Sequence, residues 1–336
     1  MRATESNIIK RLIKVTGVLL VVLVLALLIG LSIGSSGSSL TALWNGLSRS
    51  ESSDSVLMTI LWKIRLPRVL LAALVGGALS LGGLVFQALL RNPLAEPYIL
   101  GISGGSAIGA IVGILLGFSQ FPGITLTSFG ASLATLILIL GISAGQSILR
   151  KNALLLSGVM VNAFCSAVIM FLVSMTQDTR LHNIIFWLMG DLSLGNLQHT
   201  IILALFLIPC FVVIFMYANT MNLMLMGKDM AQSMGVNIRR ANLVLLLVTS
   251  LMVSACVSQC GLIGFVGLVI PHLFRLFLGP DHRLLLPACI LGGGAYMVLC
   301  DLLARAIPQQ GELPAGVITA LIGAPLFIYL LKRSNP

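Results

Sequence analysis

Two arginines, Arg65 and Arg68, are three residues apart at the start of a long apolar run. Residues with this spacing share one face of a helix, and Pro67 between them suits the first helical turn, where a missing N–H costs nothing. Two fixed cations on one face can bind carboxylates of a soluble partner, or they can reach lipid headgroups along their apolar stems. The spacing alone leaves both interpretations open.

A second charged group lies near the end of the chain, where Asp301 and Arg305 are four residues apart and Glu312 follows in a turn. Side chains with this spacing can form an ion pair on a helix. We expect these charges near the outer membrane interface, where the cost of burying a charge is small. A proton relay is therefore the weaker hypothesis.

The sequence contains no recognisable catalytic set. It lacks the G-x-S-x-G, H-E-x-x-H and Walker A patterns, and its six cysteines fall within apolar runs without metal-ligand spacing. His272, which follows a proline, is expected to be a structural hydrogen-bonding residue at the inner end of a helix. We therefore predict a non-catalytic chain with no cofactor and no metal site. Energy for uphill transport would come from a partner or an ion gradient.

The composition indicates an integral membrane protein. Of 336 residues, 58% are hydrophobic and 9% are charged, with a mean hydropathy of +1.07, whereas roughly a quarter of the residues are charged in a soluble domain. The net charge of +10 is dispersed among apolar segments and forms no stripe with aromatic residues. We therefore expect contact with membrane lipids and not with nucleic acid.

The apolar runs predict an all-α membrane protein with about ten transmembrane helices. A helix needs roughly 20 apolar residues to cross a hydrocarbon core of about 30 Å. The expected helices cover residues 12–33, 66–89, 98–117, 124–148, 153–175, 196–218, 241–261, 263–278, 284–305 and 314–332. We interpret the first run as a retained helix and expect one transmembrane domain over residues 1–336.

The distribution of basic residues predicts the topology. With the N-terminus inside, only six of the 20 Lys and Arg residues fall in outer segments, namely Arg49, Lys63, Arg65, Arg68, Arg180 and Arg305. This split follows the positive-inside tendency. Ten crossings then return the C-terminus to the cytoplasm. The Ser- and Gly-rich outer segment 34–60 is expected to be a loop with a short surface helix around residues 40–47.

Small residues recur along the second expected helix at Ala72, Gly76, Ser80 and Gly83. Such a stripe lets helix backbones approach closely in lipid, so helix packing is the main interpretation. Ser80 and Gln87 are also candidates to line an aqueous path. The rotation of the helix decides whether they do so.

Glycine and proline interrupt the apolar sequence in two places, residues 91–109 and 261–272. Non-helical backbone at membrane depth is tolerated only where protein or water covers it. The number of helices between the two segments reverses their direction, as an inverted repeat requires. The first segment lacks the glycine-rich phosphate-binding pattern, so nucleotide binding is not expected there.

Residues 221–240 form the longest inner connection and do not fit the membrane. We expect short helices broken at Gly227 and Gly235, with methionines along one face at Met224, Met226, Met230 and Met234. Flexible, polarizable methionine suits an adaptable surface for docking another protein. The alternative is an amphipathic helix that rests on lipid.

A series of motifs over nearly the whole chain resembles the FecCD-type permeases, which import cobalamin, ferric siderophores and haem through ABC systems. The motifs are Arg65-Leu-Pro-Arg68, Gln87-Ala-Leu-Leu-Arg-Asn-Pro-Leu-Ala-Glu-Pro97, Leu100-Gly-Ile-Ser-Gly104, Trp187-Leu-Met-Gly190, Gly264-Phe-Val-Gly-Leu-Val-Ile-Pro-His272, Asp281-His-Arg283, Glu312-Leu-Pro314 and Gly323-Ala-Pro325.

The resemblance implies the type II permease fold of ABC importers in a bacterial inner membrane. It implies a homodimer with the pore on its axis, two ATPase subunits on the cytoplasmic side and a substrate-binding protein outside. It assigns binding-protein docking to Arg65, Arg68 and Arg305. It assigns ATPase coupling to Leu225, Met226, Gly227, Lys228, Asp229, Met230, Ala231, Met234 and Gly235.

From the sequence we therefore predict the pore-forming permease subunit of an ABC importer for a metal chelate or corrinoid, powered by a separate ATPase. The alternative is an ion-coupled secondary transporter, which would need acidic residues at mid-membrane that the sequence does not clearly show. A third possibility, an intramembrane enzyme, lacks a nucleophile–base or metal constellation. The motifs do not separate ferric siderophore, haem and cobalamin as cargo.

Overall fold

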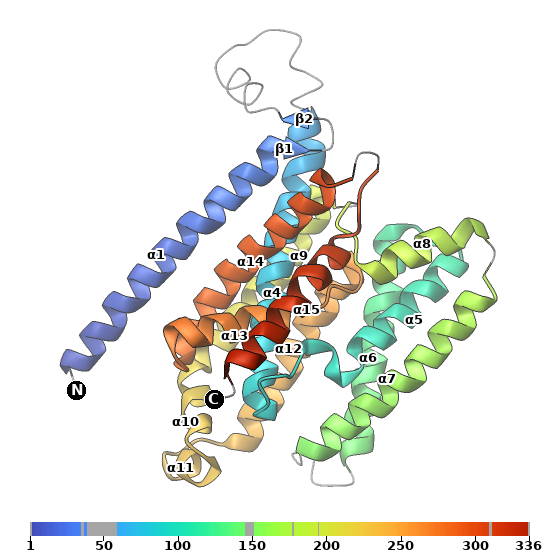
Figure 1. Ribbon diagram of the computed structural model, residues 1–336. Helices are drawn as coiled ribbons and strands as arrows, with labels where there is room; N and C mark the ends of the chain where they lie inside the picture. Colours follow the sequence, from blue (N-terminus) through green and yellow to red (C-terminus); the bar gives the residue numbers. More distant parts are fainter. Residues whose placement is uncertain are drawn as a thin grey trace.

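The computed structural model describes residues 2–34, 37–38, 59–144, 151–176, 178–193, 195–308 and 311–334. These residues form a bundle of helices (Figure 1). The α-helices are α1 (Arg2–Ser32), α4 (Leu66–Leu90), α5 (Ile102–Leu115), α6 (Thr125–Ala144), α7 (Lys151–Ser174), α8 (Asp178–Met189), α9 (Leu197–Met216), α10 (Ala218–Leu225), α11 (Lys228–Ser233), α12 (Ile238–Cys260), α13 (Val266–Leu278), α14 (His282–Ala306) and α15 (Ala315–Ser334).

Short elements complete the described part of the chain. Single turns of other helix types precede three of the α-helices, namely η1 (Leu61–Arg65), η2 (Pro97–Leu100) and η3 (Gln120–Ile124). The strands β1 (Ile33–Gly34) and β2 (Gly37–Ser38) form a small antiparallel pair after α1. The surface helix expected around residues 40–47 lies outside the described residues.

Each of the ten expected apolar segments contains a helix. In the described residues, seven helices are long and apolar enough to cross a membrane, and Ile102–Leu115, Val266–Leu278 and Ala315–Leu330 are shorter apolar helices. The sequence did not predict α8, whose 12 residues include Asp178, Arg180 and His182. Because α8 is short and contains polar residues, hydropathy did not distinguish it from the connections between apolar runs.

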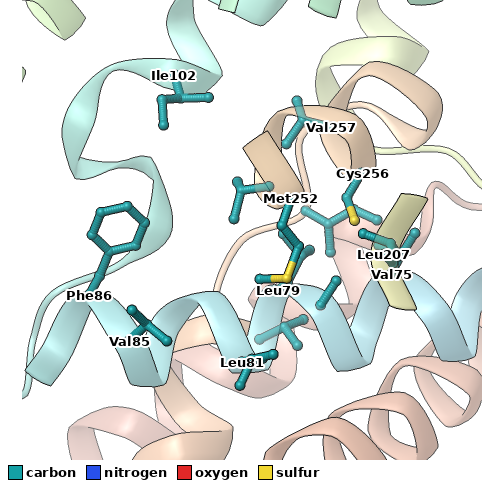
Figure 2. Packing of buried hydrophobic residues seen from close by; sticks show 14 of the residues in the cluster. Val75, Leu79, Leu81, Val85, Phe86, Ile102, Leu207, Met252, Cys256 and Val257 are labelled. Atoms are coloured by element: carbon teal, nitrogen blue, oxygen red, sulfur yellow. The ribbon is translucent and has the colours of Figure 1, made fainter. Parts of the chain in front are cut away.

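The centre of the bundle is α4, in which almost every residue is buried. Figure 2 shows Leu79 of α4 close to Met252 and Cys256 of α12, with Leu207 of α9 on the same side. Helix α14 packs along α4 more extensively than any other helix in the described residues. The core therefore forms around a single central helix.

Glycines set the closest approaches to α4. A Cβ atom on Gly76 would lie 2.3 Å from the carbonyl oxygen of Gly293 in α14, and one on Gly83 would lie 1.7 Å from the carbonyl oxygen of Gly267 in α13. No side chain fits at either position, because the neighbouring backbone occupies its place. The prediction that the small-residue stripe packs helices is confirmed.

The two segments interrupted by glycine and proline lie against each other. The Tyr98 hydroxyl donates to the Ile263 carbonyl oxygen at 2.9 Å and accepts from the Ile263 N–H at 3.1 Å. Glu96 accepts from the N–H of Phe265 at 3.0 Å, where the backbone has a positive φ of 68°. Protein side chains thus satisfy non-helical backbone in this region, as the sequence predicted. The inverted-repeat interpretation stays a prediction.

The two chain ends lie at the same end of the bundle as α10 and α11 (Figure 1). An even number of crossings produces this arrangement. Helix α1 contacts the rest of the chain mainly through α14 and leaves most of its apolar side chains exposed. An apolar helix with such a surface is suited to lipid contact.

Candidate functional site

Four charged residues meet at the end of the bundle opposite α10 and α11, and we call them the outer ionic cluster: Arg68, Asp301, Arg305 and Glu312. Nε of Arg68 lies 2.8 Å from Oδ1 of Asp301, and Nε of Arg305 lies 3.0 Å from Oδ2 of Asp301. Arg68 also pairs with Glu312 in the turn before α15. Asp301 is therefore shared by two arginines. The ion pair between Asp301 and Arg305 that their spacing allows is present.

Pairing, not exposure to water, stabilises the charges of this cluster. Asp301 is 0% exposed, whereas the sequence placed it near an interface with a low cost of burial. Its position at an end of the bundle agrees with that expectation, but the low cost of burial was wrong, because α4 and α14 pack closely and enclose the carboxylate. A buried carboxylate is tolerated when its ionic partners replace water.

The three arginines expected to dock a binding protein are all buried. Arg65, Arg68 and Arg305 are 5%, 4% and 4% exposed. Arg65 donates to the Leu31 carbonyl oxygen at 2.9 Å, and Arg305 donates to the carbonyl oxygens of Gly30 and Ile33, each at 3.2 Å. Their internal partners make them part of the connection between α1, α4 and α14. Their docking role stays a prediction.

Glu312 links the outer ionic cluster to a neighbouring cavity. Its side chain is 32% exposed, the largest value among the cluster residues. The cavity has a volume of about 800 Å³, and aromatic and polar residues line it, including Trp187, Asp191 and Arg180. This volume falls within the usual range of about 300–1,000 Å³ for ligand pockets.

The two residues proposed to line a pore are instead packed among the helices of this chain. Ser80 is completely buried against Gly293 of α14. Gln87 is 3% exposed, donates to the Gly267 carbonyl oxygen at 3.3 Å and accepts from Arg275 at 3.0 Å. The pore assignment is corrected at both positions, because the rotation of α4 turns them toward α13 and α14.

His272 also differs from its expected role as a hydrogen bonder at a helix end. It lies in the middle of α13, which continues to Leu278. Neither ring nitrogen has a hydrogen-bond partner, and the ring packs edge-on against Phe327 of α15 with 5.9 Å between centroids. The expectation was wrong because Pro271 does not end the helix here.

The inner connection forms two short helices, α10 and α11, separated at Gly227 with φ +120° and followed by Gly235 with φ +83°. The predicted breaks are therefore confirmed. Helix-ending glycines allow conformations that other residues rarely adopt. We call residues 218–235 the inner segment.

The inner segment presents three exposed methionines. Met226, Met230 and Met234 are 65%, 52% and 58% exposed. Met224 was expected on the same face, but it is buried because it faces the bundle. Of the other residues assigned to coupling, Leu225, Lys228, Asp229 and Gly235 are exposed and Ala231 is buried.

Sequence reasoning missed the side chains that attach the inner segment to the bundle. Asn222 of α10 is hydrogen-bonded to Asp281 and His282 at the start of α14. Asp281 caps α14 by accepting from the N–H of Arg283 at 3.0 Å. An aspartate before a helix is a signal that could have identified the cap. Nothing in the sequence indicated its partner 59 residues away.

The part of the chain that the structure describes contains no cluster of side chains suited to bind a metal ion. No group of three or more His, Cys, Asp or Glu side chains in it could hold a metal ion. All six cysteines are free, and five of them are buried. The outer ionic cluster is therefore held by ion pairs and by helix packing.

Known proteins resemble this chain over most of its length. The profile of the FecCD transport family matches residues 21–333. The hemin transport system permease protein HmuU of Yersinia pestis is 38% identical over 325 residues, which cover 95% of each protein. The cobalamin import system permease protein BtuC of Halobacterium salinarum is 42% identical over 274 residues, which cover 81% of this chain and 73% of that protein.

The fold agrees with the sequence similarity. A solved structure, described as an inward-facing conformation of a metal-chelate type ABC transporter, superposes with a TM-score of 0.85. It is 32% identical and covers 95% of this chain and 99% of that chain. The chain therefore belongs to the FecCD transport family, as a non-catalytic transmembrane permease of the ABC importer class.

Proposed function

We propose that this chain forms half of a homodimeric translocation pore that imports a metal chelate or corrinoid across a bacterial inner membrane. A separate ATPase would drive the cycle from the cytoplasmic side, and a substrate-binding protein would deliver the cargo outside. Both termini would lie in the cytoplasm. The observation that carries the proposal is the methionine-rich inner segment, which projects from one end of a bundle with the fold of a metal-chelate type transporter.

The inner segment has the properties of a protein-docking surface. Exposed methionines can adapt to a partner groove, and the glycines at Gly227 and Gly235 give the two helices fixed, separate directions. Lys228 and Asp229 add charges of both signs at the start of α11. The chain ends lie at this same end of the bundle, which supports a common cytoplasmic face (Figure 1).

The burial of Ser80 and Gln87 supports a pathway between two copies. Ser80 and Gln87 contact neighbouring helices of the same chain, so neither side chain of α4 lines an open path within the core of a single chain. A path at a two-fold interface would leave this tightly packed core unchanged. In this arrangement each tightly packed chain would form one rigid half of the pore.

The relatives supply the cargo classes. One relative is named for hemin transport and another for cobalamin import, and the superposed structure is of the metal-chelate type. These cargos are large chelates of a metal ion. We therefore propose ferric siderophore, haem or cobalamin as the cargo.

An ion-coupled transporter would need a carboxylate free to bind the coupling ion. Asp301 is the completely buried carboxylate of the outer ionic cluster, and two arginines hold it. Glu96 accepts a hydrogen bond from the Phe265 backbone. These engaged carboxylates support the ABC importer over ion coupling.

The proposal is tested by uptake into proteoliposomes. The chain is reconstituted with and without a candidate ATPase and binding protein from the same organism, and uptake of radiolabelled cobalamin, ferric siderophore and haem is measured. Uptake of one cargo that requires both partners and ATP is the expected result, and it names the cargo. Uptake by the chain alone that follows an ion gradient would overturn the proposal.

A further inference from the structure

Helix α10 of the inner segment is fixed to the start of α14 by a single amide side chain. Nδ2 of Asn222 donates to Oδ1 of Asp281 at 2.7 Å. Oδ1 of Asn222 accepts from the backbone N–H of His282 at 2.8 Å and lies 2.9 Å from Nδ1 of the His282 ring. Both ends of the amide are thus used, and this fixes the position of α10 relative to the first turn of α14.

Asp281 is a firm anchor for this contact. Burial opposes ionisation of its carboxyl group, but the hydrogen bonds from Arg283 and Asn222 outweigh burial and lower its pKa to about 2. The Arg283 guanidinium lies 2.8 Å from Oδ2 of Asp281. The carboxylate therefore stays charged near neutral pH and can accept from Asn222 at all times.

A second contact, two residues further along α10, fixes this helix to α4. Nη2 of Arg91, the residue that ends α4, donates to the carbonyl oxygen of Met224 at 2.9 Å. Met221 and Met224 are buried beneath the same helix. Side-chain contacts thus connect α10 to both α4 and α14, whereas the chain itself continues only into α9 and α11.

Helices α4 and α14, which both contact α10, are also joined to each other at the opposite end of the bundle. They pack along each other through Gly76 and Gly293, and the Arg68–Asp301 pair joins their outer ends at 2.8 Å. A displacement of α10 would therefore move two helices that are already fastened together. Rigid helices with packed contacts carry such displacements, whereas flexible loops absorb them.

We propose that Asn222 and Arg91 are positioning residues that transmit movement of the inner segment to α14 and α4. The inference rests on the proposed docking of an ATPase to the inner segment. It adds that docking and transmission depend on different residues. The exposed methionines hold the partner, and the half-buried Asn222 together with Arg91 carries its movement into the bundle.

The test measures cargo uptake per ATP hydrolysed in proteoliposomes that hold the complete complex. Asn222→Ala and Arg91→Ala should each lower this ratio about tenfold, because each removes one of the side-chain contacts that connect α10 to the bundle. The ATPase should co-purify at unchanged stoichiometry. Arg239→Ala at the start of α12 is the control, since its side chain is exposed and lies outside the inner segment, and it should leave the ratio unchanged.

Swapping the side chains of Asn222 and Asp281 distinguishes a loss of transmission from a folding defect. Asn222→Asp alone places two carboxylates together and should uncouple the complex. Adding Asp281→Asn restores a donor and an acceptor and should recover most of the ratio. An unchanged ratio in Asn222→Ala, an equal loss in Arg239→Ala, or no recovery in the exchanged pair would each overturn the inference.

The proposed function itself fails in a different way. If the unaltered chain retains no ATPase, then the inner segment is not a docking surface, and the proposed function is overturned together with the inference. If the ATPase binds and uptake depends on ATP, but Asn222→Ala remains fully coupled, only the inference is overturned.

Discussion

Arg68 of α4 and Asp301 of α14 form an ion pair at 2.8 Å, although they are 233 positions apart in the sequence. Arg305 approaches the other oxygen of the same carboxylate at 3.0 Å. The outer ends of the two central helices are therefore held by a charge that has no access to water. Removal of the Asp301 charge would leave Arg68 and Arg305 buried without their shared counter-ion.

Asp301→Asn should be strongly destabilising. The substitution keeps the size of the side chain but leaves Arg68 and Arg305 buried without their shared counter-ion, at a cost of about 3–5 kcal/mol. Thermal unfolding of the purified protein in detergent measures the effect. The exposed Asp229→Asn serves as the control, and equal melting temperatures for the two variants would contradict the role of the cluster.

Glu312→Gln should strengthen association with the binding protein if Arg68 contributes to docking. Glu312 now competes for Arg68, and a half-exposed ion pair of this kind is worth about 0.2–1 kcal/mol. The expected gain in affinity is about two- to fivefold and should shrink as salt is added. Affinity is measured with the chain in nanodiscs, and an unchanged or weaker affinity would count against docking at Arg68.

Replacement of Met226, Met230 and Met234 by aspartate should detach the ATPase. Three charges in an apolar contact would lower its affinity at least about tenfold, because central contacts dominate an interface. Co-purification from membranes gives the measurement, and the triple leucine variant is the control for size and hydrophobicity. Stoichiometric ATPase on the aspartate variant would disprove the coupling assignment.

Gly83→Ala should impair folding, because its Cβ would lie 1.7 Å from the Gly267 carbonyl oxygen. Forcing α4 and α13 apart is expected to cost about 1–3 kcal/mol or more. Gly130→Ala in α6 is the matched control, since a Cβ there meets nothing within 4 Å. Yield and melting temperature of the two variants give the comparison, and equal values would show that the approach is not critical.

Tyr98→Phe should loosen the contact between the two interrupted segments. It removes both hydrogen bonds to the Ile263 backbone and leaves polar backbone groups without their partner, at about 1–3 kcal/mol. Hydrogen exchange at Ile263 should accelerate. The exposed Tyr329→Phe provides the comparison, and unchanged exchange at Ile263 in the Tyr98 variant would argue that water replaces the hydroxyl.

The sequence predicted the helices well because every one of the ten lies in an apolar run, and seven of them have the length that a bilayer requires. The ten segments, the breaks at Gly227 and Gly235 and the packing stripe at Gly76 and Gly83 all depend on local composition. The family could also be predicted, since its motifs are contiguous in the chain. These are properties that neighbouring residues determine.

The environment of single polar residues could not be predicted in this way. Spacing placed Arg65 and Arg68 on one helix face. It could not show that Arg65 donates to the Leu31 carbonyl oxygen or that Arg68 pairs with Asp301. Gln87 was a pore candidate because it is a polar residue in an apolar helix, and the sequence did not show that Arg275, 188 positions away, is its partner. Long-range pairs of this kind depend on how helices rotate against one another, and hydropathy carries no information on that rotation.

Helices α5 and α13 contain 14 and 13 residues, so they extend only about 20 Å at 1.5 Å per residue and cannot cross a core of about 30 Å alone. Each follows a longer neighbour in the chain, α4 and α12, which can enter the bilayer unaided. The short helices complete their crossings only when Tyr98 and Glu96 have satisfied the backbone between them. We therefore expect the biogenesis of this permease to be cooperative, with the two pairs of helices meeting before either short helix is stably inserted.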